Sequence, residues 1–459
     1  MTAGVNGRIW APAERTDEML TPPAIEATGE VLPATVLDVE LSDPLPTVAA
    51  IAPDGRRVAQ AWMLVRLFTE PLGTLLVDVP ESGLRPGGLA AAVEAELGTA
   101  LRPRLGALGL AALPIDGITP GTEPAFLARR REVLADAPHI TVVICTRERP
   151  GALARALDSV LAQAYPDFRV LVVDNAPVTG ATAEVVRSAA RRGPVEYLVE
   201  PKGGLSFARN TAVAAAPGEI LAWLDDDEYA DPNWLAEVAR ALADHPEADV
   251  VSGVIVPAEL ETRAQLWFEQ FGGHSKGRGF RPDVFGPATA HLQSPLYPLP
   301  PFGTGANMTF RAGVIERIGG FDTALGAGTP AMGSEDTLAF TQVLVGGGTI
   351  VYQPSAVTHH YHRRDFDGLH KQMVGYGAGL TAAYTSLLLR RPGLLWPLLK
   401  LAPGALRDLT SSDSLRVSTL LADFPRELLK ANRRGMVAGP RAYLKGRRAA
   451  KAKTRGAGR

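Results

Sequence analysis

The chain has 459 residues and a formal net charge of −2, with 47 Lys and Arg against 49 Asp and Glu. This length allows two or three domains, each with its own core, and the balanced charge gives no indication of nucleic-acid binding. The single cysteine, Cys145, excludes an internal disulfide framework and indicates a reducing compartment. We expect Cys145 to be a buried apolar residue, because it follows the apolar run at 140–144.

The two ends of the chain show no pattern typical of a targeting or membrane-spanning segment. The N-terminus lacks a basic segment followed by an apolar stretch, so no signal peptide is predicted. The longest apolar candidate, residues 387–406, is interrupted by Arg390, Pro397 and Lys400. We therefore expect a cytoplasmic protein. The C-terminal segment allows two interpretations: a packed helical ending with a solvated tail, or a peripheral contact with the inner face of a membrane through this stretch and the basic tail at 445–459.

The first part of the chain predicts a small accessory domain. Residues 1–30 form a loose leader without a regular pattern, and strand-like apolar runs follow between 35 and 79, interrupted by the turn signal Pro53-Asp54-Gly55. Residues 89–97 predict a short helix. We assign residues 1–115 to an N-terminal α+β domain and residues 116–138 to a linker.

From residue 140 onward, short apolar runs alternate with helical segments. The runs predict buried strands at 140–144, 169–173, 195–199 and 220–224. This alternation predicts an α/β domain with a mainly parallel sheet and helices on both faces. Ligands bind such sheets beyond the carboxyl ends of the strands, so we expect Thr146, Asp174 and Asp225 to converge on one crevice. We assign this domain to residues 139–365 and a helical region with a basic tail to residues 366–459.

Four acidic residues follow the last of these strands directly: Asp225, Asp226, Asp227 and Glu228. Their charges repel one another, and a divalent cation is the usual means of offsetting that cost. Oxygen ligands at this density suit Mg²⁺ or Mn²⁺, which can in turn hold a substrate diphosphate. A solvated acidic turn is the alternative interpretation.

The opening of the α/β segment reads VVICTRERPGALARALDSVLAQAYPDFRVLVVDN. It resembles the nucleotide-binding start of the family 2 glycosyltransferases, which have the GT-A fold, and the resemblance extends to residue 362. It implies that Thr146 and Arg147 line the nucleotide pocket and that Asp174 hydrogen-bonds the base, which a carboxylate in a polar cleft can do. A simple turn at Asp174-Asn175 is the alternative.

A Gly-rich loop and the acidic cluster continue this resemblance. The stretch GGLSFARN resembles the loop of the family that ends in ARN; glycines permit close backbone approach, and the following helix N-terminus favours anions. The resemblance implies donor contacts from Gly204 and Arg209. The cluster matches the D-x-D signature of the family, which implies that Asp227 binds the metal, that Asp225 holds the ribose or the metal, and that Asp226 is the intervening residue of the donor site.

Two downstream stretches, FGTGANM and GGFD, resemble the acceptor-side motifs of the family, and Glu335-Asp336 resembles its ED motif. The resemblance implies that Asp336 is the catalytic base, with Glu335 beside it. A hydroxyl nucleophile needs a nearby carboxylate to take its proton as the new bond forms. The alternative is a pair of carboxylates placed at a helix N-terminus because the helix dipole favours them.

Three histidines close the resembling segment: His359, His360 and His362. The resemblance implies that one of them is a further ligand of the metal or the diphosphate, and imidazole can bind Mn²⁺. His359 fits the spacing best, and His360 is its rival. A purely structural role is the third possibility.

These patterns together predict a metal-dependent, inverting glycosyltransferase that uses Mn²⁺ or Mg²⁺. We expect it to move a sugar from a nucleotide-diphosphate donor to a hydroxyl of a glycan, a lipid-linked acceptor or a small molecule; cell-envelope glycans are among the candidates. One alternative is a sugar-phosphate nucleotidyltransferase, which would need a basic, Gly-rich opening loop. The other is a non-catalytic sugar- or nucleotide-binding subunit, which would be expected to lack the acidic cluster or Asp336.

Overall fold

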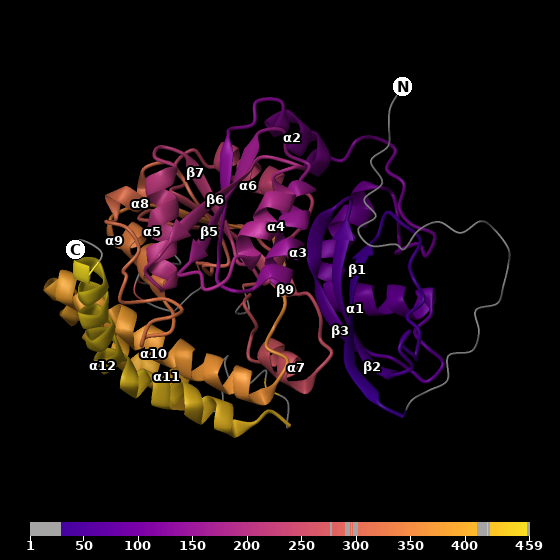
Figure 1. The fold of residues 1–459 in the computed structure, drawn as a ribbon. Helices are drawn as coiled ribbons and strands as arrows, with labels where there is room; N and C mark the ends of the chain where they lie inside the picture. The colour runs from indigo at the N-terminus through magenta and orange to yellow at the C-terminus, as the bar shows by residue number, and fades with distance from the viewer. Residues whose placement is uncertain are drawn as a thin grey trace.

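The computed structural model describes residues 29–275, 278–289, 294, 296, 302–410, 420 and 423–456. Figure 1 shows a small N-terminal sheet on one side, a large central sheet covered by helices, and a group of C-terminal helices on the other side. The architecture is α/β, as the alternation of strands and helices predicts.

The N-terminal sheet has three strands: β1 (Val31–Glu40), β2 (Arg57–Leu67) and β3 (Glu70–Asp78). β1 pairs with β2 in parallel, and β3 pairs with β2 antiparallel. Because side chains alternate along a strand, β2 serves two cores. Met63 and Val65 pack with helix α1 (Pro86–Ala107), whereas Trp62 and Leu64 belong to the core of the central domain. The N-terminal sheet is therefore built into the central domain.

The central sheet has the strand order β10-β12-β9-β11-β7-β4-β5-β6, with β8 paired to β12. Its strands are β4 (Ile140–Thr146), β5 (Phe168–Asn175), β6 (Val195–Glu200), β7 (Ile220–Leu224), β8 (Glu228–Ala230), β9 (Val250–Pro257), β10 (Asp283–Phe285), β11 (Asn307–Phe310) and β12 (Ile350–His360).

The predicted parallel strands are confirmed, and further strands complete a mixed sheet. β4 pairs in parallel with β5 and β7, β5 pairs in parallel with β6, and β12 pairs in parallel with β9. β11 runs antiparallel between β7 and β9, and β8 and β10 are antiparallel to β12. β11 has only four residues, too few to give a recognisable period in the sequence.

Helices cover both faces of the central sheet, as predicted. One face carries α3 (Pro150–Leu161), α4 (Ala181–Ala189) and α6 (Trp234–Asp244), and the other carries α5 (Leu205–Ala215), α8 (Val314–Arg317) and α9 (Glu335–Val345). Helix α2 (Ala125–Leu134) lies in the predicted linker region and is tied to α6 by Arg130, whose Nε donates to Glu237 Oε1 at 2.7 Å. Helix α7 (Arg263–Gln270) follows β9.

The C-terminal region is helical, as predicted: α10 (Phe366–Arg390), the 3₁₀ turn Pro392–Leu394, α11 (Leu395–Thr410) and α12 (Arg426–Gly456). α10 and α12 pack backbone to backbone. A Cβ at Gly377 would lie 1.9 Å from the carbonyl oxygen of Asn432, and one at Gly435 would lie 2.1 Å from that of Val374, so only glycine permits this approach. Among the described helices, none combines the length and the apolar character that a membrane span requires.

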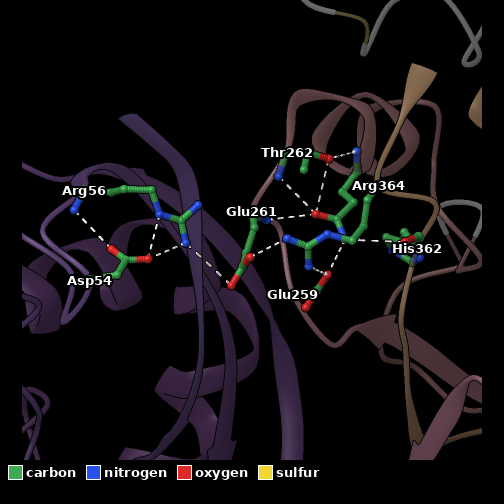
Figure 2. Close-up of polar contacts among 8 residues, drawn as sticks. Asp54, Arg56, Glu259, Glu261, Thr262, His362 and Arg364 are labelled. Carbon is green, nitrogen blue, oxygen red and sulfur yellow. Dashed lines mark hydrogen bonds and ion pairs between the residues drawn. The ribbon is translucent and has the colours of Figure 1, made fainter. Parts of the chain in front are cut away.

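A charge network connects the N-terminal sheet with the start of α7 (Figure 2). Arg56 pairs with Asp54 at 2.7 Å and lies 3.7 Å from Glu261, which in turn pairs with Arg364 at 2.6 Å. Thr262 caps α7 in a capping box with Gln265. Pairs this exposed contribute little individually, so their main effect is to fix where α7 begins relative to the end of β12.

Candidate active site

A cavity of about 1560 Å³ opens beyond the carboxyl ends of β4 and β7. All three parts of the chain line it. The N-terminal sheet contributes Trp62 and Leu76, the central domain contributes the acidic cluster, and the C-terminal helices contribute Tyr376 and Met436. The position agrees with the rule that open α/β sheets bind ligands at the carboxyl ends of their strands.

Asp226 and Asp227 share one arginine at the edge of this cavity. Asp226 Oδ2 accepts from the hydroxyl of Thr146 at 2.7 Å, and its Oδ1 accepts from Arg149 Nη1 at 2.9 Å. The same Nη1 lies 2.9 Å from Asp227 Oδ2, and His360 Nε2 lies 3.4 Å from Asp227 Oδ1. Thr146 and the cluster therefore meet, as the sequence predicts, and Arg149 and His360 join them.

The carboxyl groups of the cluster differ in their ionisation. Burial, helped by the charge of Asp227, raises the pKa of Asp225 to about 6. Burial also opposes ionisation of Asp227, but His360 and Arg149 outweigh it and hold its pKa well below the usual range. Burial and the two neighbouring aspartates raise the pKa of Glu228 well above its usual range. Asp227 is thus ionised, whereas ionisation of its neighbours Asp225 and Glu228 is unfavourable in this environment.

A buried arginine connects the cluster with helix α9. Arg209 is 1% exposed, and its Nη1 lies 3.0 Å from Glu335 Oε1 while its Nη2 lies 3.6 Å from Asp225 Oδ1. Nη2 also donates to the carbonyl oxygen of Gly305 at 3.0 Å. Burial raises the pKa of Glu335 to about 7 despite the arginine. Glu335 therefore lines the cavity as the partner of Arg209.

Asp336 stands at the start of α9 and lines the same cavity as the acidic cluster. Its Oδ2 accepts from the backbone N–H of Gly305 at 2.6 Å, and its Oδ1 accepts from that of Thr337 at 2.7 Å. The preceding Ser334 adopts φ 65°, an unfavourable conformation for a residue with a Cβ. The backbone is bent so that Asp336 projects into the cavity in a fixed orientation.

The remaining predicted donor-site residues differ in whether they line the cavity. Arg147 and Gly204 line the cavity, and Gly204 donates its N–H to Asn175 Oδ1 at 2.7 Å. Asp174 is fully buried, is not part of the cavity lining, and accepts a hydrogen bond from the Tyr197 hydroxyl at 2.8 Å. Burial raises its pKa. Its neighbour Asn175 lines the cavity in its place.

The structure separates the two adjacent histidines that the sequence left as rivals. His359 stacks on Tyr229 with ring centroids 4.4 Å apart, and the nearest carboxylates to its ring nitrogens are Asp38 and Asp231. His360 instead faces Asp227. Since successive side chains of a strand point to opposite faces, only one of them can reach the cluster. The choice of His359 as metal ligand therefore does not agree with the geometry, and His360 occupies that place.

Other residues at the site carried no clear signal in the sequence. Arg149 stands in the loop after β4 and Arg363 lies 4.0 Å from Asp227; both are ordinary surface types in a sequence. Trp62 comes from the N-terminal sheet, far from the motifs along the chain. Arg149 could have been predicted as a site residue only from its position in the sequence, three residues after Thr146.

The residues around Asp227 fit a divalent cation. Asp227 Oδ1 and His360 Nε2 lie 3.4 Å apart and offer the hard oxygen and borderline nitrogen ligands that Mn²⁺ accepts; Asp225 belongs to the same cluster. Burial, together with the charge of Asp227, raises the pKa of Asp225 to about 6, so added positive charge would favour its ionised form. A bound cation would supply that charge.

This geometry, an acidic cluster after β7 of a mixed sheet and a carboxylate at the start of α9 that lines the same cavity, is that of a glycosyltransferase domain of the GT-A fold. Residues 141–319 match the family model described as "Glycosyl transferase family 2". The match confirms the prediction from the sequence for this part of the chain.

Two curated relatives extend the comparison. The chain is 24% identical over 245 residues to the glucosyl-dolichyl phosphate glucuronosyltransferase of Haloferax volcanii, covering 50% of this chain and 72% of that protein. It is 29% identical over 229 residues to the succinoglycan biosynthesis protein ExoM of Rhizobium meliloti, covering 48% of this chain and 66% of that protein. Both alignments leave about half of this chain unmatched.

Among solved structures, the mannosyltransferase PcManGT of Pyrobaculum calidifontis, in complex with GDP-Man and Mn²⁺, is similar with a TM-score of 0.42 and 20% identity. The match covers 72% of this chain and 81% of that one.

Proposed function

We propose that the protein transfers a sugar from a nucleotide-diphosphate donor to an acceptor hydroxyl, with inversion at the anomeric carbon and with Mn²⁺ or Mg²⁺ as cofactor. The observation that carries the proposal is that two kinds of group line one cavity. Asp225, Asp227 and His360 contribute to it from the ends of β7 and β12, and Asp336 contributes from the start of α9.

In this proposal Asp225, Asp227 and His360 hold the cation. When bound, the cation supplies positive charge that stabilises the leaving diphosphate. Arg149 and Arg363 lie beside Asp227 and can contact the same phosphates, since guanidinium groups bind phosphate in a fixed geometry.

The donor nucleotide is assigned to the loops after β4 and β5. Thr146 orients Asp226, and Arg147 and Gly204 provide the wall next to it. The predicted base contact of Asp174 passes to its neighbour Asn175, which lines the cavity, because Asp174 is fully buried and bonded to Tyr197.

Asp336 is the proposed general base. It takes the proton from the acceptor hydroxyl as that oxygen attacks the anomeric carbon, the bond to the diphosphate oxygen breaks, and the nucleoside diphosphate leaves. Arg209 positions the site by joining Asp225, Glu335 and the backbone of Gly305. A buried arginine with these contacts connects the acidic cluster with the start of α9.

The experiment that tests the proposal is product analysis. The purified protein is incubated with UDP-, GDP- and dTDP-sugars and Mn²⁺, with and without sugar alcohols and glycan fragments as acceptors. Release of a nucleoside diphosphate, dependent on Mn²⁺, is the expected result. Release of pyrophosphate from a sugar phosphate and a nucleoside triphosphate would point instead to a nucleotidyltransferase.

We further propose that the helical region at 366–459 holds the protein against an anionic membrane. Leu395, Trp396 and Leu399 of α11 are at least half exposed, and α12 carries eleven Lys and Arg against one Glu. Apolar and basic side chains on neighbouring helices are typical of a peripheral membrane contact. Because Met436 of α12 lines the cavity, this contact would bring a lipid-linked acceptor close to the site.

Vesicle sedimentation tests the membrane contact. We expect binding to vesicles that contain phosphatidylglycerol, weakened by salt and by Trp396→Ala, and little binding to pure phosphatidylcholine. Equal recovery in the supernatant with both vesicle types would contradict the contact.

We also propose that the chain divides into domains at residues 115, 138 and 365. We propose that the N-terminal domain helps to bind the acceptor, because Trp62, Thr74 and Leu76 line the cavity.

A further inference from the structure

Three side chains, His360, His362 and Glu269, form a hydrogen-bonded series that runs from Asp227 to helix α7. We call this series the relay. His360 Nε2 lies 3.4 Å from Asp227 Oδ1, and His360 Nδ1 lies 3.1 Å from Nδ1 of His362. His362 Nε2 lies 2.8 Å from Oε1 of Glu269, near the end of α7. His360 and His362 are buried, so these contacts are not shared with bulk water.

The positions of the protons in this series of side chains follow from which atoms can donate and which can only accept a hydrogen bond. A carboxylate only accepts, so His362 Nε2 must carry the proton that it donates to Glu269. Two imidazole nitrogens 3.1 Å apart need one donor and one acceptor. If His362 is neutral, its Nδ1 accepts, His360 Nδ1 carries the proton, and His360 Nε2 keeps its lone pair. This lone pair and the Asp227 carboxylate, 3.4 Å away, are both acceptors and suit a cation between them; without a cation, Nε2 carries a proton and donates to Asp227.

We propose that Glu269 and His362 are positioning residues, which hold His360 in the tautomer whose Nε2 can bind the cation beside Asp227. The inference rests on the metal role assigned to Asp227 and His360 under the proposed function. Ligating histidines commonly donate their second N–H to a carboxylate or another acceptor, which fixes the ring and its tautomer. Here the acceptor is Nδ1 of His362, and the carboxylate of Glu269 accepts from the other ring nitrogen of His362.

Two features of the chain keep Glu269 in place. A Cβ at Gly273, which has φ +52°, would lie 2.2 Å from Glu269 Oε1, so a larger residue there would displace this carboxylate from its present position. At the other end of α7, the Thr262 capping box and the network of Glu261 and Arg364 fix the helix start (Figure 2).

A different arrangement would use the same residues as ligands of their own cation. Ring nitrogens of His274, His360 and His362 lie within 4.8 Å of one another. However, the 3.1 Å between the two Nδ1 atoms is a hydrogen-bond distance, which places a proton between them. Glu269 already occupies His362 Nε2. The contacts therefore favour the relay, and the three-histidine site becomes an outcome of the test.

The first measurement is Mn²⁺ affinity of the full chain, followed by electron paramagnetic resonance. We expect Glu269→Leu to raise the dissociation constant about tenfold, in line with other second-sphere substitutions. Glu269→Gln, which keeps an acceptor oxygen, should have a smaller effect. Asp167→Asn is the matched control, because it removes another carboxylate–imidazole contact, at 2.7 Å from His139 Nδ1, at the opposite end of β4. It should leave the affinity unchanged.

The second measurement reports the tautomer directly and does not depend on activity. In ¹⁵N-histidine-labelled protein loaded with Mg²⁺, the His360 signal, assigned by its loss in His360→Gln, should show a protonated Nδ1. Glu269→Gln should retain this signature and Glu269→Leu should weaken it. If Glu269→Leu does not fold, the Gln variant and the wild-type signature still decide the question.

Two results would overturn the relay while leaving the proposed function intact: unchanged Mn²⁺ affinity in Glu269→Leu, or a protonated Nε2 on His360 in the loaded protein. Mn²⁺ binding that survives Asp227→Ala but is lost in His274→Ala would assign the cation to the three histidines. A wild-type protein that binds no Mn²⁺, with or without a donor, would overturn the metal role itself, and the relay with it.

Discussion

His360 Nε2 lies 3.4 Å from Asp227 Oδ1, a contact between the last residue of β12 and the loop after β7. The neighbouring His359 points to the other face of the strand and stacks on Tyr229. The alternation of a β-strand thus separates a candidate ligand from a buried structural residue.

This relationship predicts different outcomes for the two histidines. His360→Ala should weaken Mn²⁺ binding by tenfold or more, because it removes a candidate ligand. His359→Ala should leave Mn²⁺ affinity within about twofold and lower the unfolding free energy by about 2 kcal/mol, as expected for a truncated buried ring. Calorimetric titration and urea unfolding measure the two effects. The reverse pattern would restore His359 as the ligand.

Metal affinity should depend on pH through Asp225. Its pKa is raised to about 6 in the folded protein, so a proton must leave before the carboxylate can bind a cation. Below pH 6 we expect Mn²⁺ affinity to fall by about tenfold per pH unit, and above it to level off. Asp225→Asn should bind more weakly but with a shallower slope between pH 5 and 6. Titrations in a series of buffers test both slopes.

The same shift has a consequence for stability without metal. A carboxyl group whose folded pKa exceeds its unfolded pKa binds more protons in the folded state, so its contribution is present at low pH and is lost as the pH rises through the folded value. For Asp225 and Glu335, with pKa values of about 6 and about 7, the metal-free protein should lose stability between about pH 4 and 7. A thermal midpoint that rises over this interval more in wild type than in Asp225→Asn would contradict the assignment.

Asp336→Asn should abolish transfer and leave donor binding intact. The amide keeps the shape and can still accept from Gly305 N–H, but it cannot take the acceptor proton. We expect turnover to fall by 10²–10⁴-fold, the usual contribution of a general base, with an unchanged donor dissociation constant. Thr341→Val, one turn further along α9, is the control and should retain most activity, because its hydroxyl donates only to the carbonyl oxygen of Thr337. Retained turnover in Asp336→Asn would remove this residue as the base.

Arg66 ties the N-terminal sheet to the central domain. Its side chain is 6% exposed and lies 2.9 Å from Asp231 Oδ2 and 2.8 Å from Asp38 Oδ1. Arg66→Met leaves the carboxylate of Asp231 buried without its cation, so we expect a loss of about 3–5 kcal/mol in urea unfolding. Asp38→Asn removes the more exposed partner and should cost less. Equal losses from the two variants would argue against a buried pair as the connection.

The parallel half of the sheet and the acidic cluster could be predicted from the sequence, because each depends on local order. Apolar runs alternate with helical segments up to residue 224, and Asp225–Asp227 follow immediately. The convergence of Thr146 with this cluster follows from the topology of parallel strands.

The rest of the site depends on contacts between distant segments. Trp62 reaches the cavity because β2 serves two cores, and Glu269 reaches His362 across 93 positions. The choice between His359 and His360 depends on contacts of the same kind: the face to which each histidine points depends on the register of β12 against β8 and β9, which spacing along the chain does not contain.

The most direct test of the central claim is calorimetric titration of the purified protein with UDP-, GDP- and dTDP-sugars, with and without Mn²⁺, in wild type and in Asp227→Ala. We expect one nucleotide to bind to the wild type only when Mn²⁺ is present, and that binding to be lost in Asp227→Ala. Donor binding that is independent of both Mn²⁺ and Asp227, or no binding of any donor with Mn²⁺ present, would contradict a metal-dependent glycosyltransferase site at this cluster.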